Sequence, residues 1–316
     1  MSIPNNRRIL VQLVKEICAD HGIDCQAISE DWIIKLEKNS QKHFIYGYNF
    51  NLNGSATQLI ANDKSATNDL LALANIPTVS HELFLNPTLL HYVEAKGNWQ
   101  RMLNFVETHG FPIVCKANTG TGGNDLFFVH SQQELEIAAK KIFTKERALA
   151  LSPYFEITAE HRFIILNGQC ELSYRKIRPA VIGDGQASLF HLISDYCQKH
   201  QLPIANYVSD LPYPLETVLP KTETCFLSQK HNLSKGAIVE LVENPSLTAL
   251  ALKAADTINL QFGAVDIIES DNNYQVLEIN AGVMMESLVK RLPEGRQMAK
   301  LIYQKAILSI FKAQTL

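Results

Sequence analysis

Hydrophobic and polar positions alternate along this 316-residue chain with two distinct periods. Helical spacing of apolar residues predicts helices over 7–20, 64–74, 99–109, 131–143, 188–200 and 246–259. The same spacing predicts a helical end of the chain over 288–311, interrupted at 293–295 by proline and glycine. Period-two alternation with β-branched residues predicts strands over 32–37, 43–48, 113–117, 126–130, 161–166, 169–176, 264–269 and 274–280. The pattern therefore predicts a mixture of helices and short strands.

The last predicted hairpin, within 263–282, carries acidic side chains at positions where they could converge. A three-residue loop with Asn273 in the left-handed conformation would place Asp266 opposite Glu278, and Asn280 on the same face. A two- or four-residue loop would put the two acids on opposite faces. In the first register the three side chains form an oxygen-only cluster, which suits Mg²⁺. The alternative is an ordinary hairpin whose acids are solvated.

A second stretch, over 111–131, places a lysine before a glycine-rich loop. Lys116 lies near the end of a strand, and the loop that follows contains Gly120, Thr121, Gly122 and Gly123. Backbone N–H groups of such a loop can close on phosphate oxygens, and the lysine can neutralise them. The loop lacks the Gly-Lys-Ser/Thr ending of a Walker motif, and a strand follows it where that motif has a helix. The alternative is a flexible turn between two strands.

A third feature is a group of arginines on the hairpin that turns at 167–168, an Asn-Gly pair typical of two-residue turns. A regular register would place Glu160 opposite Arg175, with Arg162 on the same face. Arg178 follows just past the strand. Such a cationic face predicts an anionic ligand, and the alternative is an exposed strand with cross-strand ion pairs.

Composition excludes several classes of protein. A net charge of −3 gives no electrostatic reason to expect nucleic acid or an acidic membrane as a partner. No apolar run is long enough to span a bilayer, and the first residues lack the pattern of a signal peptide. The six cysteines contain no Cys-x-x-Cys pair, so we expect reduced thiols in a cytoplasmic protein.

The order of these motifs resembles the ATP-grasp superfamily of carboxylate–amine ligases, especially cyanophycin synthetases and glutathione-forming ligases. The resemblance covers about residues 60–290. It rests on six segments in family order, namely Asn62-Asp63-Lys64, the strand and glycine loop over 111–123, Glu160-His161-Arg162, the segment 178–185, Asn232-Leu233-Ser234 and Glu278-Ile279-Asn280. The chain departs from the family at Lys235, where a threonine is usual, and after Asn280, where a Pro-Gly turn is usual.

The resemblance implies an α+β protein with the ATP-grasp fold, in which two α/β subdomains clasp ATP beside a small N-terminal domain. It implies an N-terminal domain over 1–80, a lid subdomain with the glycine-rich loop over 81–151, and a subdomain with the metal site over 152–316.

The resemblance also implies roles for individual residues. Metal ligands for Mg²⁺, with Mn²⁺ as an alternative, would be Asp266, Glu278 and Asn280. ATP would be held by Lys64, Lys116, Gly120, Thr121, Gly122, Gly123, Pro153, Phe155 and Glu160. The transferring phosphoryl group and the substrate carboxylate would be contacted by Arg162, Arg178 and Asn232.

The function implied is that of an ATP-dependent, ADP-forming ligase, which activates a small carboxylate as an acyl phosphate and joins it to an amine. Its partners would be small-molecule carboxylate and amine substrates, without nucleic acid or membrane, and a homodimer is one option for its assembly. The alternative is a nucleotide-binding regulatory or scaffold protein of the same fold without turnover. Phosphorylation of the carboxylate without amide formation lies between the two.

Overall fold

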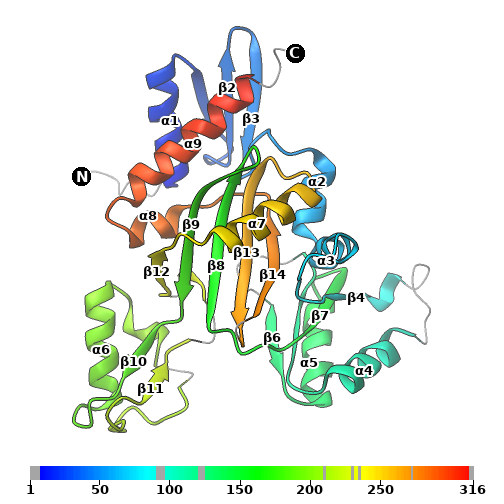
Figure 1. Cartoon of the computed structure of the whole chain (residues 1–316), viewed down its shortest axis with the longest axis vertical. Coiled ribbons are helices and arrows are strands. Elements are labelled where there is room, and N and C mark those ends of the chain that lie inside the picture. Colours follow the sequence, from blue (N-terminus) through cyan, green and yellow to red (C-terminus); the bar gives the residue numbers. More distant parts are fainter. Residues whose placement is uncertain are drawn as a thin grey trace.

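The computed structural model describes residues 8–89, 97–119, 125–208, 211–228, 231–233, 236–271 and 273–312. This part of the chain contains a central five-stranded sheet, a four-stranded sheet, a three-stranded sheet and a two-stranded ribbon, with helices between them (Figure 1). The mixture of helices and strands predicted from the sequence is confirmed, and the fold is α+β.

The central sheet has five antiparallel strands in the order β12-β9-β8-β13-β14. Their bounds are β8 (Ala159–Leu166), β9 (Gln169–Ile177), β12 (Ile238–Leu241), β13 (Phe262–Ser270) and β14 (Asn273–Asn280). One face is covered by α7 (Pro245–Thr257), α2 (Ser55–Asn62) and α3 (Lys64–Leu73) (Figure 1). Val265 and Ile267 of β13 point into this core. Alternation along the strand therefore sends Ala264 and Asp266 to the opposite face.

That opposite face is only partly covered by apolar side chains. Its upper part packs against α9 (Gly295–Lys312) and α1 (Ile9–His21), and Ala264 belongs to this core. The chain continues from α1 into a three-stranded sheet, formed by β1 (Asp24–Ile28), β2 (Ile33–Lys38) and β3 (Gln41–Tyr46). The short helix α8 (Glu286–Arg291) leads into α9. The lower part of the face, from Asp266 downward, is left for polar side chains.

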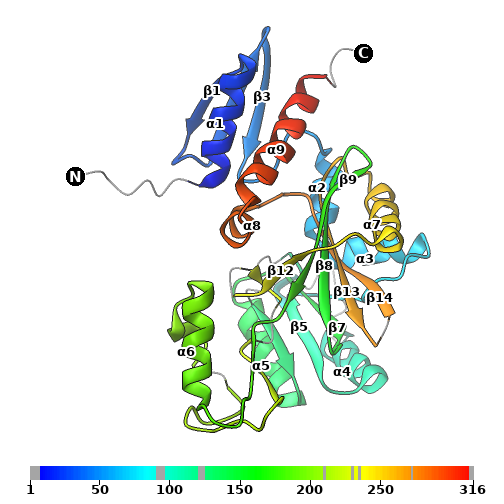
Figure 2. The same ribbon diagram turned by 60° about the vertical axis from the view of Figure 1, so that its left-hand side comes forward.

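The four-stranded sheet lies beneath the central sheet in both views (Figures 1 and 2). Its strand order is β4-β7-β5-β6, formed by β4 (Glu82–Leu85), β5 (Ile113–Ala117), β6 (Leu126–Val129) and β7 (Ala148–Pro153). It packs with α4 (Gly97–His109) and α5 (Gln132–Phe143) around a core of its own. The chain between β9 and β12 forms the ribbon of β10 (Ala180–Ile182) and β11 (Thr224–Phe226) with α6 (Leu189–His200), which lies at the lower left of Figure 1. Two 3₁₀ turns are η1 (Pro87–Leu89) and η2 (Ile204–Asn206).

Helix starts follow the local sequence closely. Asp63 accepts a hydrogen bond from the Ala66 N–H at 2.8 Å, and Ser131 accepts one from Glu134 N at 3.2 Å. Both are side-chain N-caps at the predicted positions, so the predicted starts of α3 and α5 are confirmed. Strand β1 was not predicted from the sequence. The predicted domain boundaries near 80 and 151 stay predictions.

Two consecutive hairpins of the central sheet contain a one-residue bulge, and each bulge changes a predicted register. In β9 the extra residue is Glu171, so Glu160 pairs with Lys176, and the predicted pairing of Glu160 with Arg175 is wrong. In β14 the extra residue is Leu277. A β-bulge shifts every later side chain by one position relative to the partner strand, which is why regular alternation misplaced Arg175 and Lys176 of β9.

No helix in the described ranges combines the length and the apolar character that a membrane span needs. All six cysteines lie in the described part, and none forms a disulfide.

Candidate active site

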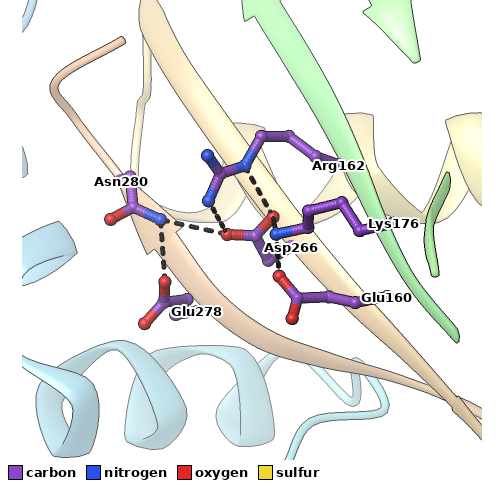
Figure 3. A network of polar contacts seen from close by, with 6 residues as sticks. All are labelled: Glu160, Arg162, Lys176, Asp266, Glu278 and Asn280. Carbon is purple, nitrogen blue, oxygen red and sulfur yellow. Dashed lines mark hydrogen bonds and ion pairs between the residues drawn. The ribbon is translucent and has the colours of Figure 1, made fainter. Parts of the chain in front are cut away.

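A network of charged and polar side chains lies on the face of the central sheet opposite α7 (Figure 3). At its centre is Asp266 of β13, whose side chain is 0% exposed. Arg162 lies directly opposite on β8 and donates twice, from Nε to Oδ1 at 2.8 Å and from Nη2 to Oδ2 at 2.5 Å. Lys176 of β9 places Nζ 3.3 Å from Asp266 Oδ1 and also forms an ion pair with Glu160. Three adjacent strands thus bring two cations and two carboxylates together.

The charges of this network determine the ionisation of Asp266. Burial alone would raise the pKa of its carboxyl group, because a charge is poorly solvated inside a protein. The charges of Arg162 and Lys176 and their hydrogen bonds outweigh burial and lower the pKa of Asp266 to about 2. Asp266 is therefore a carboxylate at any physiological pH.

Asp266, Glu278 and Asn280 lie on one face of the sheet, as predicted, but the turn and the register that bring them there differ from the prediction. Ser270 pairs with Asn273, so the loop has two residues, and Asp271 in that loop is left-handed whereas Asn273 is not; the predicted three-residue loop with a left-handed Asn273 is therefore wrong. A two-residue loop in a regular hairpin would have separated the acids. The bulge at Leu277 restores the pairing of Asp266 with Glu278.

The amide of Asn280 bridges the two carboxylates. Its Nδ2 donates to Asp266 Oδ2 at 3.2 Å and to Glu278 Oε1 at 3.1 Å (Figure 3). Half a turn of the amide exchanges nitrogen for oxygen, which would give three oxygens converging on one point. Two carboxylates and an amide oxygen are the ligand chemistry of Mg²⁺.

The ligand set depends on Asn280. Within the described residues, no group of three His, Cys, Asp or Glu side chains is arranged to hold a metal ion. The four acceptor directions of Asp266 are taken by Arg162, by Lys176 and by the Asn280 amide, and only the amide can turn away without leaving a buried cation unpaired. A divalent cation fits this site by taking the place of the amide N–H groups.

Two lysines approach the acidic residues from other elements. Lys64 is the first residue of α3, and its Nζ donates to the Asn118 carbonyl at 3.3 Å, just past the end of β5. Lys116 on β5 is 7% exposed. Burial lowers its pKa to about 8, Glu278 opposes the shift, and the charge of Lys64 adds to it. Both predicted phosphate-binding lysines therefore lie within electrostatic reach of Glu278.

A histidine that the sequence did not single out also belongs to this region. His81 is 3% exposed, and its Nε2 has no hydrogen-bond partner among the described residues. Burial, with the nearby charges of Lys116 and Lys64, holds the pKa of His81 well below its usual range. No local pattern marks this position, because a single histidine next to a short strand is common.

Arg178 belongs to a separate cluster beside the first. Its guanidinium lies 3.9 Å from the ring centroid of Phe226 and donates to Glu156 Oε1 at 2.9 Å. His231 is 5% exposed, and burial together with the charges of Arg178 and Lys176 lowers its pKa to about 4. Asn232 follows directly in the chain, so the loop of Asn232 is close to both clusters.

Other predicted residues lie elsewhere. Arg175, expected on the cationic face, lies on the opposite face with its Nη2 4.0 Å from Glu269 Oε2, and Lys176 takes its place. Pro153 ends β7, and Phe155 lies half-buried in the following loop. The glycine-loop residues Gly120, Thr121, Gly122 and Gly123, together with Lys235, fall outside the described residues.

Comparison with known proteins agrees with this architecture. Residues 226–302 match the family model of the RimK-like ATP-grasp domain. A cyanophycin synthetase of Synechocystis sp. is 26% identical over 248 residues, covering 72% of this chain and 27% of the relative. The glutathione biosynthesis bifunctional protein GshAB of Streptococcus mutans is 24% identical over 298 residues, covering 85% and 37%. The chain thus spans between about a quarter and two fifths of the length of these curated relatives.

Solved structures show the same fold. A bifunctional glutathione synthetase from Pasteurella multocida superimposes with a TM-score of 0.55 and 16% identity, covering 95% of this chain and 44% of that chain. A D-alanine–D-alanine ligase from Bacillus anthracis superimposes with a TM-score of 0.51 and 14% identity, covering 84% and 73%. The resemblance inferred from the sequence is confirmed, and the chain has the ATP-grasp fold.

Proposed function

We propose that this chain is an ATP- and Mg²⁺-dependent ligase that joins a small carboxylate to an amine. The observation that carries the proposal is the cluster between the two sheets, where Asp266, Glu278 and Asn280 converge and Lys64 and Lys116 lie within electrostatic reach. Among the described residues of this cluster, the cations Lys64, Lys116, Arg162 and Lys176 face the carboxylates Asp63, Glu160, Asp266 and Glu278. Lysines at the edge of a cluster that can hold a divalent cation suit a polyphosphate, because the lysines and the cation would share the neutralisation of its charge.

The reaction proceeds in two steps. The carboxylate oxygen of the substrate attacks the γ-phosphorus of ATP, the bond to the β-phosphate oxygen breaks, and ADP leaves. The amine nitrogen then attacks the acyl carbon, inorganic phosphate leaves, and the nitrogen loses a proton. The protein's task is to position the groups and to neutralise charge, because the transferring phosphoryl group carries most of the change in charge.

The residues divide this task. Asp266, Glu278 and Asn280 would hold the divalent cation, which when bound neutralises the terminal phosphates. Lys116 and Lys64 would hold phosphate oxygens, and the glycine-rich loop would cover them. Pro153, Phe155 and Glu160 would line the nucleotide site. On this proposal the nucleotide would lie between a lid of 81–151 and a subdomain of 152–316, with 1–80 as a small N-terminal domain.

The three residues expected to contact the reacting groups differ in their freedom to do so. The guanidinium of Arg162 donates twice to Asp266, so we propose that Arg162 acts through Asp266 as a positioning residue. Arg178 and Asn232 lie beside the network and are proposed to bind the substrate carboxylate. The substrate class is an amino acid, a short peptide or a similar small acid, with a small amine as the second substrate.

A nucleotide-binding protein without turnover remains the second candidate. The observation that favours it is the full occupation of Asp266 by protein donors, which leaves its carboxylate satisfied without a metal ion. The two candidates differ in whether ATP is consumed.

The test is ADP release by the purified chain with ATP and Mg²⁺, in pools of small acids with and without amines. Hydroxylamine in place of the amine would trap an acyl phosphate as a hydroxamate. Glu278→Gln is expected to keep the fold and to lower ADP release about 100-fold or more. Glu136→Gln, an exposed change on α5, is the matched control. ADP release by Glu278→Gln at the wild-type rate would refute the assignment, and tight ATP binding without any ADP release would support the second candidate.

A further inference from the structure

A cavity of about 540 Å³ lies where the end of α6, the start of α8 and the loop of Leu233 meet. Its lining differs from that of the proposed active site, because none of the predicted site residues takes part. The lining consists of Lys199, His200, Gln201, Leu233, Ser287, Lys290 and Arg291.

The charge of this lining is strongly one-sided. Among the residues that the structure describes, the lining contains three cations and one histidine and no carboxylate. Lys199, Lys290 and Arg291 are in no ion pair with any carboxylate of the described residues. Three cations around one concavity repel each other, and an anion bound between them relieves that repulsion.

One wall of the cavity is fixed in place. Arg291 Nη1 donates to the His200 carbonyl at 3.1 Å, and its Nη2 donates to the Leu233 carbonyl at 3.3 Å. These bonds tie α8 both to the end of α6 and to the loop that continues from Asn232. Since two N–H groups of the Arg291 guanidinium already bind backbone carbonyls, Arg291 contributes mainly its positive charge to the cavity, and fewer of its hydrogen-bond donors are left for a ligand.

The free donors are therefore of another kind. The ammonium groups of Lys199 and Lys290 are on exposed residues at the ends of flexible stems, and Ser287 and Gln201 add a hydroxyl and an amide. Single donors that lie apart from each other suit a ligand with several spaced acceptor groups. One compact phosphate is better matched by a guanidinium, which can donate two parallel hydrogen bonds to it. The volume is in the range of small-molecule sites, far above that of one phosphate ion. Leu233 is the one apolar residue among the described residues of the lining, which favours a polar ligand.

We propose that this cavity binds a small organic polyanion with two or more spaced carboxylates, such as a short acidic peptide or a tricarboxylate. The site is separate from the proposed ATP site, and the proposal does not depend on ligase activity. It adjoins that site through Leu233, so an anion here would hold the loop of Asn232 against α8.

The test is isothermal titration of the full chain at low salt, without nucleotide or divalent cation. The probes are tri-glutamate and citrate, with tri-glutamine and sulfate for comparison. We expect tri-glutamate and citrate to bind with a Kd below about 1 mM, and tri-glutamine and sulfate to bind at least about tenfold more weakly.

The variant Lys199→Gln/Lys290→Gln is expected to raise the Kd of tri-glutamate about tenfold or more. Its matched control, Lys140→Gln/Lys253→Gln, removes the same charge from exposed positions on α5 and α7 and should change the Kd less than about twofold. Circular dichroism checks that both variants fold.

Three outcomes would overturn the proposal. They are no heat of binding with either polyanion, an equal loss in the control variant, and sulfate binding as tightly as tri-glutamate. Because no ATP is present, failure here is distinct from failure of the ligase proposal, which is read from ADP release.

Discussion

Removing the charge of Lys176 should destabilise the protein far more than an ordinary surface lysine would, and a second neutral substitution should restore much of the loss. Lys176 is 5% exposed, and its ammonium lies between Glu160 and Asp266. Lys176→Met keeps a similar volume but leaves two buried carboxylates with only Arg162 to balance them.

The size of the effect follows from the geometry. At 3.3 Å, with an effective dielectric constant of about 20, the attraction between Lys176 Nζ and Asp266 Oδ1 is about 5 kcal/mol. Loss of one partner from a buried pair typically costs about 3–5 kcal/mol, because the other charge stays buried without compensation. Glu160→Gln in the same chain removes the surplus negative charge and leaves the Arg162–Asp266 pair intact. We expect the double variant to cost only about 1–2 kcal/mol, which gives a coupling free energy of about 2 kcal/mol or more.

Urea denaturation of the wild type, both single variants and the double variant measures this coupling as a double-mutant cycle. The slope with denaturant must stay constant, so that midpoints report free energies of unfolding. Lys305→Met is the control, because its partner Glu171 lies at the edge of the sheet and the Lys305 side chain is half exposed; we expect it to cost about 0–1 kcal/mol. Additive effects of the two single substitutions, or a cost of Lys176→Met equal to that of the control, would refute the reasoning.

Two further predictions concern His231 and a helix cap. Burial lowers the pKa of His231 from 6.5 to about 4. Between these pH values the unfolded chain binds a proton at this residue and the folded chain does not. The free energy of unfolding should therefore fall by up to about 3 kcal/mol between pH 6.5 and 4 and level off below pH 4. His231→Gln should remove that share of the fall in urea titrations at several pH values, and curves parallel to wild type would contradict it. Asp63→Ala and Ser131→Ala should each cost about 1 kcal/mol as lost N-caps, measured by thermal melting. Only Asp63→Ala should weaken ATP binding, because Lys64 follows that cap, and equal losses of ATP affinity in both variants would count against the role of Lys64.

Helices and their caps were predictable because the interactions that define them are local. The N-cap of α3 depends on Asp63 and the backbone three residues later, and both are visible in the sequence. Strand β1 escaped prediction because it is short and has no fully buried side chain to mark one of its faces. Its partner β2 carries the two buried residues Ile34 and Leu36.

The part of the candidate site that could be predicted consists of residues that share one strand or one hairpin. Asp266, Glu278 and Asn280 were found from alternation along one hairpin, and Lys116 from its place before a glycine-rich loop. His81 comes from a separate segment of the chain, and tertiary packing brings it near Lys116 and Lys64, as it brings Glu156 to Arg178. Contacts between segments that are far apart in the chain leave no regular spacing of residues in the sequence, so they could not be predicted from it.

The choice between Arg175 and Lys176 shows why register was the hardest part. Both registers of the hairpin place a cation opposite Glu160, so cross-strand charge pairing does not distinguish them. What decides is the one-residue bulge at Glu171, which moves every later residue of β9 by one position relative to β8.

The consequence of that register is asymmetric. Lys176 is buried against two carboxylates, whereas Arg175 keeps a half-exposed position 4.0 Å from Glu269 on the other face. A buried cation needs nearby carboxylates to balance its charge, and Asp266 can pair only with a residue on its own face of the sheet. The bulge at Glu171 therefore determines which cation completes the network around Asp266, and the charge of the proposed active site depends on a backbone irregularity near the turn of the neighbouring hairpin.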